Sequence, residues 1–196
     1  MKKVLGSLVL LSALGAMSNP AYAACALPEG KKVDDLSQEE LNAHYECSRD
    51  ELVKSYQKKG NELALKYTEW KAVATGPAKP GVHSNRYLMT YVNPIGYDLY
   101  VQYKIGPDVE FPIGTVAAKE SYKIKKNGKL KKGPLLVMTK VGNDKAPKTD
   151  GWLYSGVKSS GGTFKVSQKF CHNCHQAYTP IQDSLGYPVE AVRIKN

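Results

Sequence analysis

The stretch Cys171-His172-Asn173-Cys174-His175, near the C-terminus, decides how the rest of the chain is interpreted. It reads C-x-x-C-H, the attachment motif of a c-type haem. Two thiols three residues apart lie on one face of a helical turn, where they can form thioethers with the two vinyl groups of one porphyrin. The adjacent imidazole can then ligate the iron. The motif therefore predicts one covalent haem c held by Cys171 and Cys174, with His175 as an axial iron ligand.

Two other uses of paired cysteines fit this motif less well. A zinc site needs a second pair of ligands, and the remaining histidines, His44 and His83, do not form one. A thioredoxin-type dithiol follows a strand near the start of its domain, whereas this motif comes close to the end of the chain. Covalent haem is therefore the favoured interpretation.

The N-terminus, residues 1–23, has the pattern of a secretion signal. Two lysines precede a short apolar run, and Ala21-Tyr22-Ala23 is an A-x-A cleavage site, so we expect the mature protein to start at Ala24. The apolar run is too short for a membrane span. A lipoprotein anchored through Cys25 fits less well, because Tyr22 stands where a lipobox prefers Leu. We expect secretion across the inner membrane into the periplasm, where disulfides persist.

Two cysteines remain outside the motif, Cys25 and Cys47. In an oxidising compartment they are expected to form a disulfide that pins the mature N-terminus to the first helix. Two separate buried thiols are the alternative.

The formal net charge is +10, and it falls to +8 when Lys2 and Lys3 leave with the signal. The lysines are spread along the chain, which is typical of a solvated basic surface. Such a surface can also steer the protein towards an acidic redox partner protein. Nucleic acid is not an expected partner, because no binding motif for it is present.

The segment from Leu36 to about Val73 has a helical pattern. Ser37 and Glu40 form a capping box at its start, and Gly60 divides it into two helices. Apolar residues recur at helical spacing and predict a core face: Leu41, Tyr45, Leu52, Tyr56, Leu63, Tyr67 and Trp70. The Gly- and Pro-rich run 75–81 ends the helical region.

Beyond this run the pattern is that of short strands separated by Gly, Pro and Asn, with a turn at 93–96. Strands are predicted at Tyr87–Val92, Leu99–Ile105, Thr115–Ala118, Tyr122–Lys125, Leu135–Val141 and Trp152–Val157. The spacing favours an antiparallel meander. The predicted class is α+β, a mostly antiparallel sheet with N-terminal helices and a C-terminal haem helix. We divide the mature chain into a helical region, 24–80, and a haem domain, 81–196, within one compact unit.

The position of the motif limits the function. Small electron-transfer cytochromes carry it near the N-terminus and use a downstream Met as second axial ligand, but no Met follows His175. The second iron position is therefore either empty or filled from the preceding sheet. An empty position in an apolar pocket favours binding of a small diatomic molecule. The Val-, Tyr- and Gly-rich middle of the chain argues against a four-helix cytochrome c-prime.

Between about Trp70 and Val189 the chain resembles cytochrome P-460 and the related β-type cytochromes c-prime. The resemblance rests on five elements in order: Tyr91-Val92-Asn93-Pro94, Phe111 to Val116 with Lys119-Glu120, Val137 to Lys140, Gly151-Trp152, and Cys171 to His175.

The resemblance implies a mostly antiparallel β-fold, often a homodimer, with five-coordinate haem on the proximal His. Enzymes of this family oxidise hydroxylamine, alone or in its reaction with nitric oxide, and the c-prime relatives bind nitric oxide or carbon monoxide. The enzymes carry a lysine linked covalently to the porphyrin, and Lys119 occupies that position. Such a lysine must be neutral to act as a nucleophile, which burial beside the haem favours. An ordinary surface lysine is the alternative.

The distal side departs from the enzymes. Where they place an Arg and a carboxylate, the spacing gives Leu88 and Leu136, although a small shift in alignment would substitute Arg86 for Leu88. No Asp or Glu lies between Lys123 and Val141. Without a general base beside the iron, proton removal from hydroxylamine is poorly supported, and an apolar cap favours a neutral gas.

Met89 and Met138 also belong to the candidate distal pocket. Met138 is two residues from Leu136, on the same strand face, and could ligate the iron as a sixth ligand, although a core Met is favoured. Three hypotheses follow: a gas-binding haem protein, a hydroxylamine-oxidising enzyme with Lys119 linked to the haem, and a His/Met electron carrier. Gas binding is slightly preferred.

Overall fold

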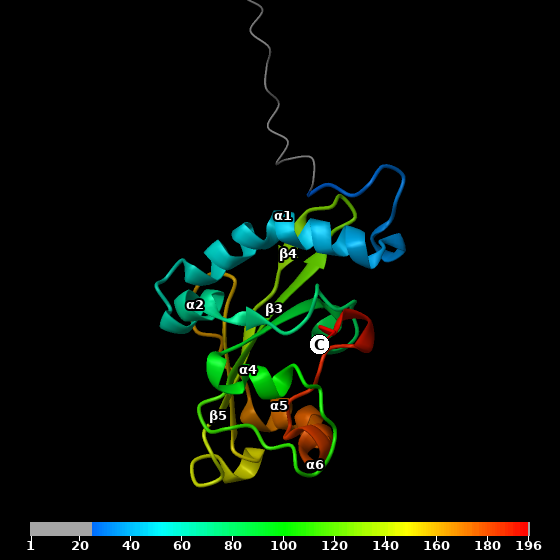
Figure 1. The fold of residues 1–196 in the computed structure, drawn as a ribbon. Helices are drawn as coiled ribbons and strands as arrows, with labels where there is room; N and C mark the ends of the chain where they lie inside the picture. Colours follow the sequence, from blue (N-terminus) through cyan, green and yellow to red (C-terminus); the bar gives the residue numbers. More distant parts are fainter. Residues whose placement is uncertain (1–24, 196) are drawn as a thin grey trace, which may run out of the picture.

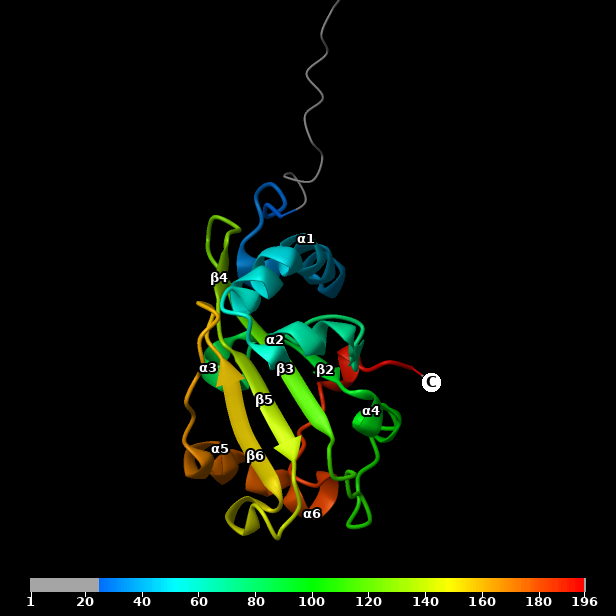
Figure 2. The same ribbon diagram turned by 90° about the vertical axis from the view of Figure 1, so that its left-hand side faces the viewer.

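The computed structural model describes residues 25–195, so the expected secretion signal lies outside the described residues. Its centre is an antiparallel sheet (Figures 1 and 2). Within the described part the order is β1-β2-β3-β5-β6, with β4 paired to β3. The strands are β1 (Lys71–Ala72), β2 (Tyr87–Val92), β3 (Val116–Ile124), β4 (Leu130–Lys132), β5 (Leu135–Lys140) and β6 (Trp152–Val157). Every pairing is antiparallel, which confirms the predicted α+β class.

The N-terminal layer is helical, as predicted. It comprises η2 (Val33–Asp35), α1 (Gln38–Gln57), α2 (Glu62–Lys66) and η3 (Tyr67–Glu69). The capping box at the start of α1 is present, with Ser37 and Glu40 each accepting a backbone N–H of the other. Gly60 has a φ of +64°, which glycine adopts without a steric penalty, and the chain breaks there between α1 and α2.

Three details of the sheet differ from the prediction. Residues 94–100 form a helix, α4 (Pro94–Tyr100), where a turn was expected, and the strand predicted at Leu99–Ile105 is wrong, because 101–105 form turns and irregular structure. Proline at the first helical position favours helix initiation, and Asn93 bonds the sheet through Gly114 O and Val116 N. The two short strands predicted on either side of Lys119 are one strand, β3, and β4 was not predicted.

The sheet has two distinct faces, because successive side chains of a strand point to opposite sides. The register pairs Tyr91 with Ala118 and Ala118 with Val137, so these residues share the side that we call the helix face. Lys119 pairs with Thr90 and Leu136, and these define the other side, the motif face. Each face has its own core.

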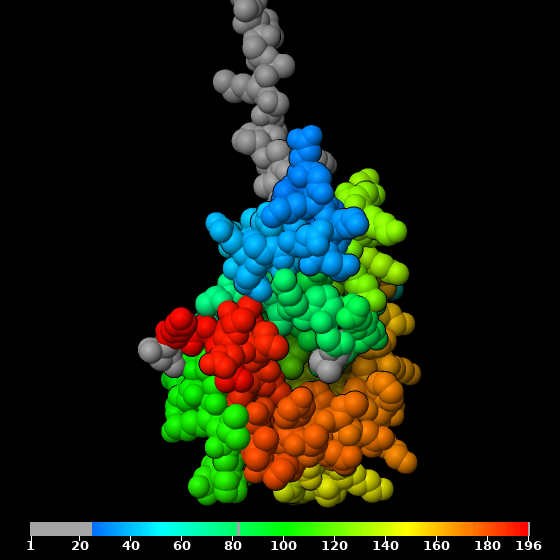
Figure 3. All heavy atoms as spheres, turned by 90° about the vertical axis from the view of Figure 1, so that its right-hand side faces the viewer, coloured from blue at the N-terminus to red at the C-terminus, as the bar shows by residue number. Residues whose placement is uncertain are grey.

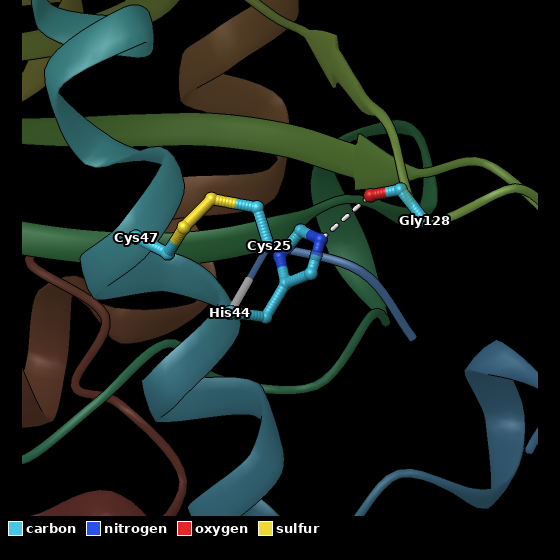
Figure 4. The surroundings of a disulfide bond; sticks show 4 residues. All are labelled: Cys25, His44, Cys47 and Gly128. Carbon is cyan, nitrogen blue, oxygen red and sulfur yellow. Dashed lines mark hydrogen bonds between the residues drawn. A yellow bond between two sulfur atoms is a disulfide. The ribbon is translucent and has the colours of Figure 1, made fainter. Parts of the chain in front are cut away.

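The helix face is covered by the N-terminal layer. Its core joins α1 to the sheet through buried Leu41, Tyr45, Leu52 and Tyr56 of the predicted stripe. A disulfide joins Cys25 to Cys47, the pairing expected from the sequence, and ties the first described residue to α1 (Figure 4). Beside it, His44 Nε2 donates to the carbonyl oxygen of Gly128, 2.7 Å away (Figure 4).

The motif face carries the C-terminal segment. It contains α5 (Gln168–His175), η5 (Gln176–Tyr178) and α6 (Thr179–Gln182). The last element, η6 (Glu190–Val192), instead adds Val192 to the core of the helix face. Two further short elements are α3 (Val82–Asn85) and η4 (Pro147–Thr149). In Figures 1 and 2, α5 lies at the end of the sheet opposite α1. Among the described residues, no helix is long and apolar enough to cross a membrane.

Candidate functional site

Helix α5 presents the C-x-x-C-H motif. Ser167 caps it, its side chain accepting the backbone N–H of Phe170 at 3.2 Å. Both motif cysteines are free thiols; Cys171 is half-buried against the core of the motif face, and Cys174 is exposed. One helical turn therefore holds two unpaired thiols beside an imidazole, the donor set that covalent haem attachment needs.

The imidazole of His175 is buried and fixed in one orientation. Its Nδ1 lies 2.7 Å from the carbonyl oxygen of Ser184, and because a carbonyl only accepts, Nδ1 carries the proton. Burial, and next the positive charge of Lys119, lower the pKa of His175 to about 4, so the ring is neutral at neutral pH. The Nε2 atom is left as the nitrogen available to a metal.

The loop that provides this carbonyl is held by a buried ion pair. Asp183 accepts from Lys140 Nζ at 2.6 Å and from the backbone N–H of Phe111 at 2.8 Å. Asp183 and Ser184 have φ values of +44° and +64°, which few non-glycine residues adopt, so these bonds hold a strained turn in place. Sequence reasoning missed Asp183 and Ser184, because nothing in the local pattern shows that Lys140 lies beside them.

Lys119 reaches the motif from β3. Its Nζ is 3.4 Å from the carbonyl oxygen of Gly186, two residues beyond Ser184. Burial lowers the pKa of Lys119 to about 8. Its charge in turn lowers the pKa values of both His175 and His83. The structure therefore brings Lys119 and the motif histidine into one site.

A second histidine, His83, enters the same site. Its ring centroid is 6.1 Å from that of His175, with an angle of 50° between the planes. Burial, followed by the charges of Lys119 and His175, lowers the pKa of His83 to about 3. The sequence pattern does not predict His83 as a site residue, because it does not complete a zinc site and it follows a Gly- and Pro-rich run.

The other predicted residues divide between the two faces. Leu88, Leu136 and Met138 lie on the motif face with Lys119. Met138 is buried in the core of that face, and Leu88 and Leu136 are half-buried. Met89 does not join them: its side chain lies in the core of the helix face, because neighbouring residues of a strand point to opposite sides. We therefore remove Met89 from the candidate pocket.

Arg86, the alternative to Leu88, is held elsewhere on the sheet. Its guanidinium packs against Gly133, so closely that a Cβ at that glycine would lie 2.8 Å from Nη1. It is not among the groups that shift the pKa of Lys119, His83 or His175.

Aromatic rings enclose the rest of His175. Tyr154 and Tyr178 have ring centroids 5.4 and 6.4 Å from it. Within the motif, His172 lies between Tyr154 and Asp150, with Nδ1 3.4 Å from the hydroxyl of Tyr154 and Nε2 3.5 Å from a carboxylate oxygen of Asp150. The two histidines of the motif therefore have different partners, since His175 bonds the carbonyl oxygen of Ser184.

The residues present fit a haem c. Two free thiols adjoin a neutral imidazole, and apolar side chains stand incompletely covered around them, including Phe170, which is 75% exposed. A porphyrin is a flat apolar group that such side chains can cover. In residues 25–195, no group of three or more His, Cys, Asp or Glu side chains is arranged to hold a bare metal ion.

Comparison with protein families matches residues 64–183 to the family described as Cytochrome P460. The chain belongs to the cytochrome P460 family. The matched range covers β1 to α6 and includes Lys119 and the C-x-x-C-H motif. Membership of the cytochrome P460 family confirms the resemblance seen in the sequence and makes the protein a c-type haem cytochrome. A search of curated proteins found no match.

Proposed function

We propose that this protein is a periplasmic monohaem cytochrome of the P-460/c-prime-β type that binds a small nitrogen oxide, such as nitric oxide. Cys171 and Cys174 would carry the two thioethers, and His175 would hold the iron through Nε2. The haem would supply the iron position at which the gas binds. The remaining groups of the site orient His175, exclude water and set the polarity around the ligand.

The observation that carries this proposal is the chemistry of the motif face. Leu88, Leu136 and Met138 surround the strand position of Lys119, and all three are apolar. The charges that lower the pKa values of His83 and His175 are those of Lys119 and of other histidines. No carboxylate of the described residues is among the groups that shift these two pKa values. Among the groups that act on these histidines there is therefore no carboxylate that could take a proton from hydroxylamine, whereas binding of a neutral gas needs no base.

The periplasmic location is supported by two features. The N-terminal pattern is that of a secretion signal, and the Cys25–Cys47 disulfide is of a kind that persists in oxidising compartments. The basic net charge favours an acidic redox partner protein, and family resemblance favours a homodimer.

A second function, hydroxylamine oxidation, is favoured by Lys119 itself. With a pKa of about 8, about a tenth of this amine is neutral at pH 7, the form that can bond to a porphyrin. This function also needs a base beside the iron to take the proton from hydroxylamine.

Absorption spectra of the purified holoprotein separate the candidates. The gas-binding function predicts an ordinary ferrous Soret band and a spectrum that changes when nitric oxide is added. A ferrous Soret band shifted far to the red, present in the wild type and in Lys123→Leu but lost in Lys119→Leu, would instead establish the cross-link. Lys123 is the matched control because it lies on the same strand and face.

Two results would overturn the proposal. A colourless protein, after expression with a working cytochrome maturation system, would exclude haem attachment. A coloured protein whose spectrum does not respond to nitric oxide would exclude gas binding.

A further inference from the structure

We propose that His83 is a second axial ligand of the haem iron, on the side opposite His175, and that it must leave before an exogenous ligand binds. This inference rests on the proposed function, because it requires a haem held by Cys171, Cys174 and His175. In this proposal the iron position opposite His175 is not open but is occupied by the imidazole of His83, which an incoming ligand displaces.

The separation of the two rings is the first observation. Their centroids are 6.1 Å apart. Two imidazoles on opposite sides of one metal, each with a metal–nitrogen bond of ~2 Å, have ring centres about 6 Å apart. Rings on a common axis can rotate about it, so the 50° angle between the planes is compatible with this arrangement.

The second observation is an unsatisfied nitrogen. The Nδ1 atom of His83 is buried and has no hydrogen-bond partner among the described residues. His175 differs, because its Nδ1 is bonded to Ser184 and its other nitrogen remains for the iron. A buried ring nitrogen without a partner is costly, and a metal bond is one way to satisfy it.

The third observation is the backbone that carries His83. Three consecutive residues, His83, Ser84 and Asn85, have φ values of +55°, +62° and +55°. The left-handed region is unfavourable for residues with a Cβ, and such outliers persist where the surroundings impose them, often at ligand-binding sites. A metal bond would compensate this strain, and release of the bond would let the turn relax.

The turn is also attached in a way that allows movement. It follows Gly81 and precedes β2, and the nearest backbone pairing before it is the bridge between Ala78 and Leu88. Figure 3 shows the face on which the green segment near residue 80 adjoins the orange segment that carries the motif. We infer that the turn formed by residues 83–85 moves away from the haem while the strands of the sheet stay paired.

Met138, the ligand considered from the sequence, is in a different position. It is buried in the core of the motif face, where it packs among groups that include Tyr154 and Trp152. It is held by strand pairing on both sides, opposite Ala117 and Tyr154. His83 therefore fits the role of a displaceable ligand better.

The test uses electron paramagnetic resonance and near-infrared magnetic circular dichroism of the ferric holoprotein. The wild type is expected to be low-spin with two nitrogen ligands of imidazole type. His83→Ala is expected to be high-spin, and added imidazole is expected to restore the low-spin signal. His44→Asn is the control, because His44 is a buried histidine on the other face of the sheet.

Gas binding gives a second readout. If His83 must leave first, the apparent rate of nitric oxide binding to the ferrous protein is limited by the fraction of molecules in which it has left. We expect His83→Ala to bind nitric oxide at least about tenfold faster than the wild type or His44→Asn.

The outcomes separate the inference from the proposed function. A wild-type ferric iron that is high-spin would overturn the ligand assignment and leave haem attachment intact. A His83→Ala variant that remains low-spin would assign the position to another group, such as Lys119 or Met138. A protein without haem would overturn both. A high-spin wild-type spectrum overturns the ligand assignment by itself, so that outcome does not depend on how the variant folds.

Discussion

The Nδ1 atom of His175 donates to the carbonyl oxygen of Ser184, and the residue before that serine is tied to β5 by a buried ion pair. The orientation of the motif histidine therefore depends on Lys140, which lies 35 positions before it in the chain numbering. Groups of this kind, which orient a ligand without touching the metal, affect metal sites strongly when they are replaced.

Replacing Lys140 by Met should leave Asp183 buried and without its cation. Removing one partner of a buried pair costs about 3–5 kcal/mol, so the free energy of unfolding should fall by that amount. Urea unfolding of the holoprotein measures it. Lys132→Met is the control, because Lys132 pairs with an exposed carboxylate of Glu51 and should change stability by less than about 1 kcal/mol. Equal losses in the two variants would contradict the role of the buried pair.

Replacing both Cys25 and Cys47 by Ser should lower stability without changing the haem spectrum. The disulfide closes a loop with a sequence separation of 22 residues, and a loop of that size contributes about 3 kcal/mol by restricting the unfolded chain. Thermal unfolding measures the loss. Adding a reductant should destabilise the wild type but not the double variant. A change in the Soret band of the double variant would show that the two faces of the sheet are coupled.

The pH dependence of stability should contain a contribution from Glu120. This carboxylate is fully buried on the helix face, where it accepts hydrogen bonds from Tyr45 and Tyr67 and pairs with Arg49. Burial raises its pKa above the usual 4.5, although these partners oppose the shift. Between pH 4.5 and the raised pKa, Glu120 is therefore protonated in the folded protein and ionised in the unfolded chain.

The stability contributed by Glu120 titration is thus complete below pH 4.5 and declines as pH rises through the folded-state pKa. Glu120→Gln should remove this decline. Unfolding free energies of both proteins, measured from about pH 4 to pH 8, test the sign. Parallel curves for the two proteins would refute it.

Replacing Ser37 by Ala should weaken the start of α1. The side chain accepts the backbone N–H of Glu40, and loss of such a cap costs about 1 kcal/mol. Chemical unfolding detects a change of this size. Ser160→Ala, at an exposed turn, should stay within about 0.5 kcal/mol of the wild type. A comparable effect at both serines would mean that the cap does not contribute.

Features encoded locally could be predicted from the sequence. The C-x-x-C-H motif, the capping box of α1, the break at Gly60 and strands β2, β5 and β6 all depend on residues close together in the chain. Lys119 was singled out through family resemblance, and in the structure its charge lowers the pKa of His175. The start of α4 was mistaken for a turn, because Asn-Pro begins turns and helices alike.

The rest of the site depends on contacts between distant segments, and no local pattern contains them. The approach of His83 to His175 and the link from Lys140 to Asp183 are of this kind. Met89 was misplaced for a related reason. The alternation of a strand separates its residues into two sets, and only the observed register shows which set faces the motif.

Lys119 and Glu120 are neighbours in the chain, yet they project from opposite sides of β3. The amine lies on the motif face, and the carboxyl group is buried among tyrosines on the helix face. A slip of one residue in strand pairing would exchange them, setting a negative charge against the porphyrin and an ammonium group among phenols. A slip of one residue is thereby penalised twice, so this dipeptide protects the chain against that misfolded but compact form.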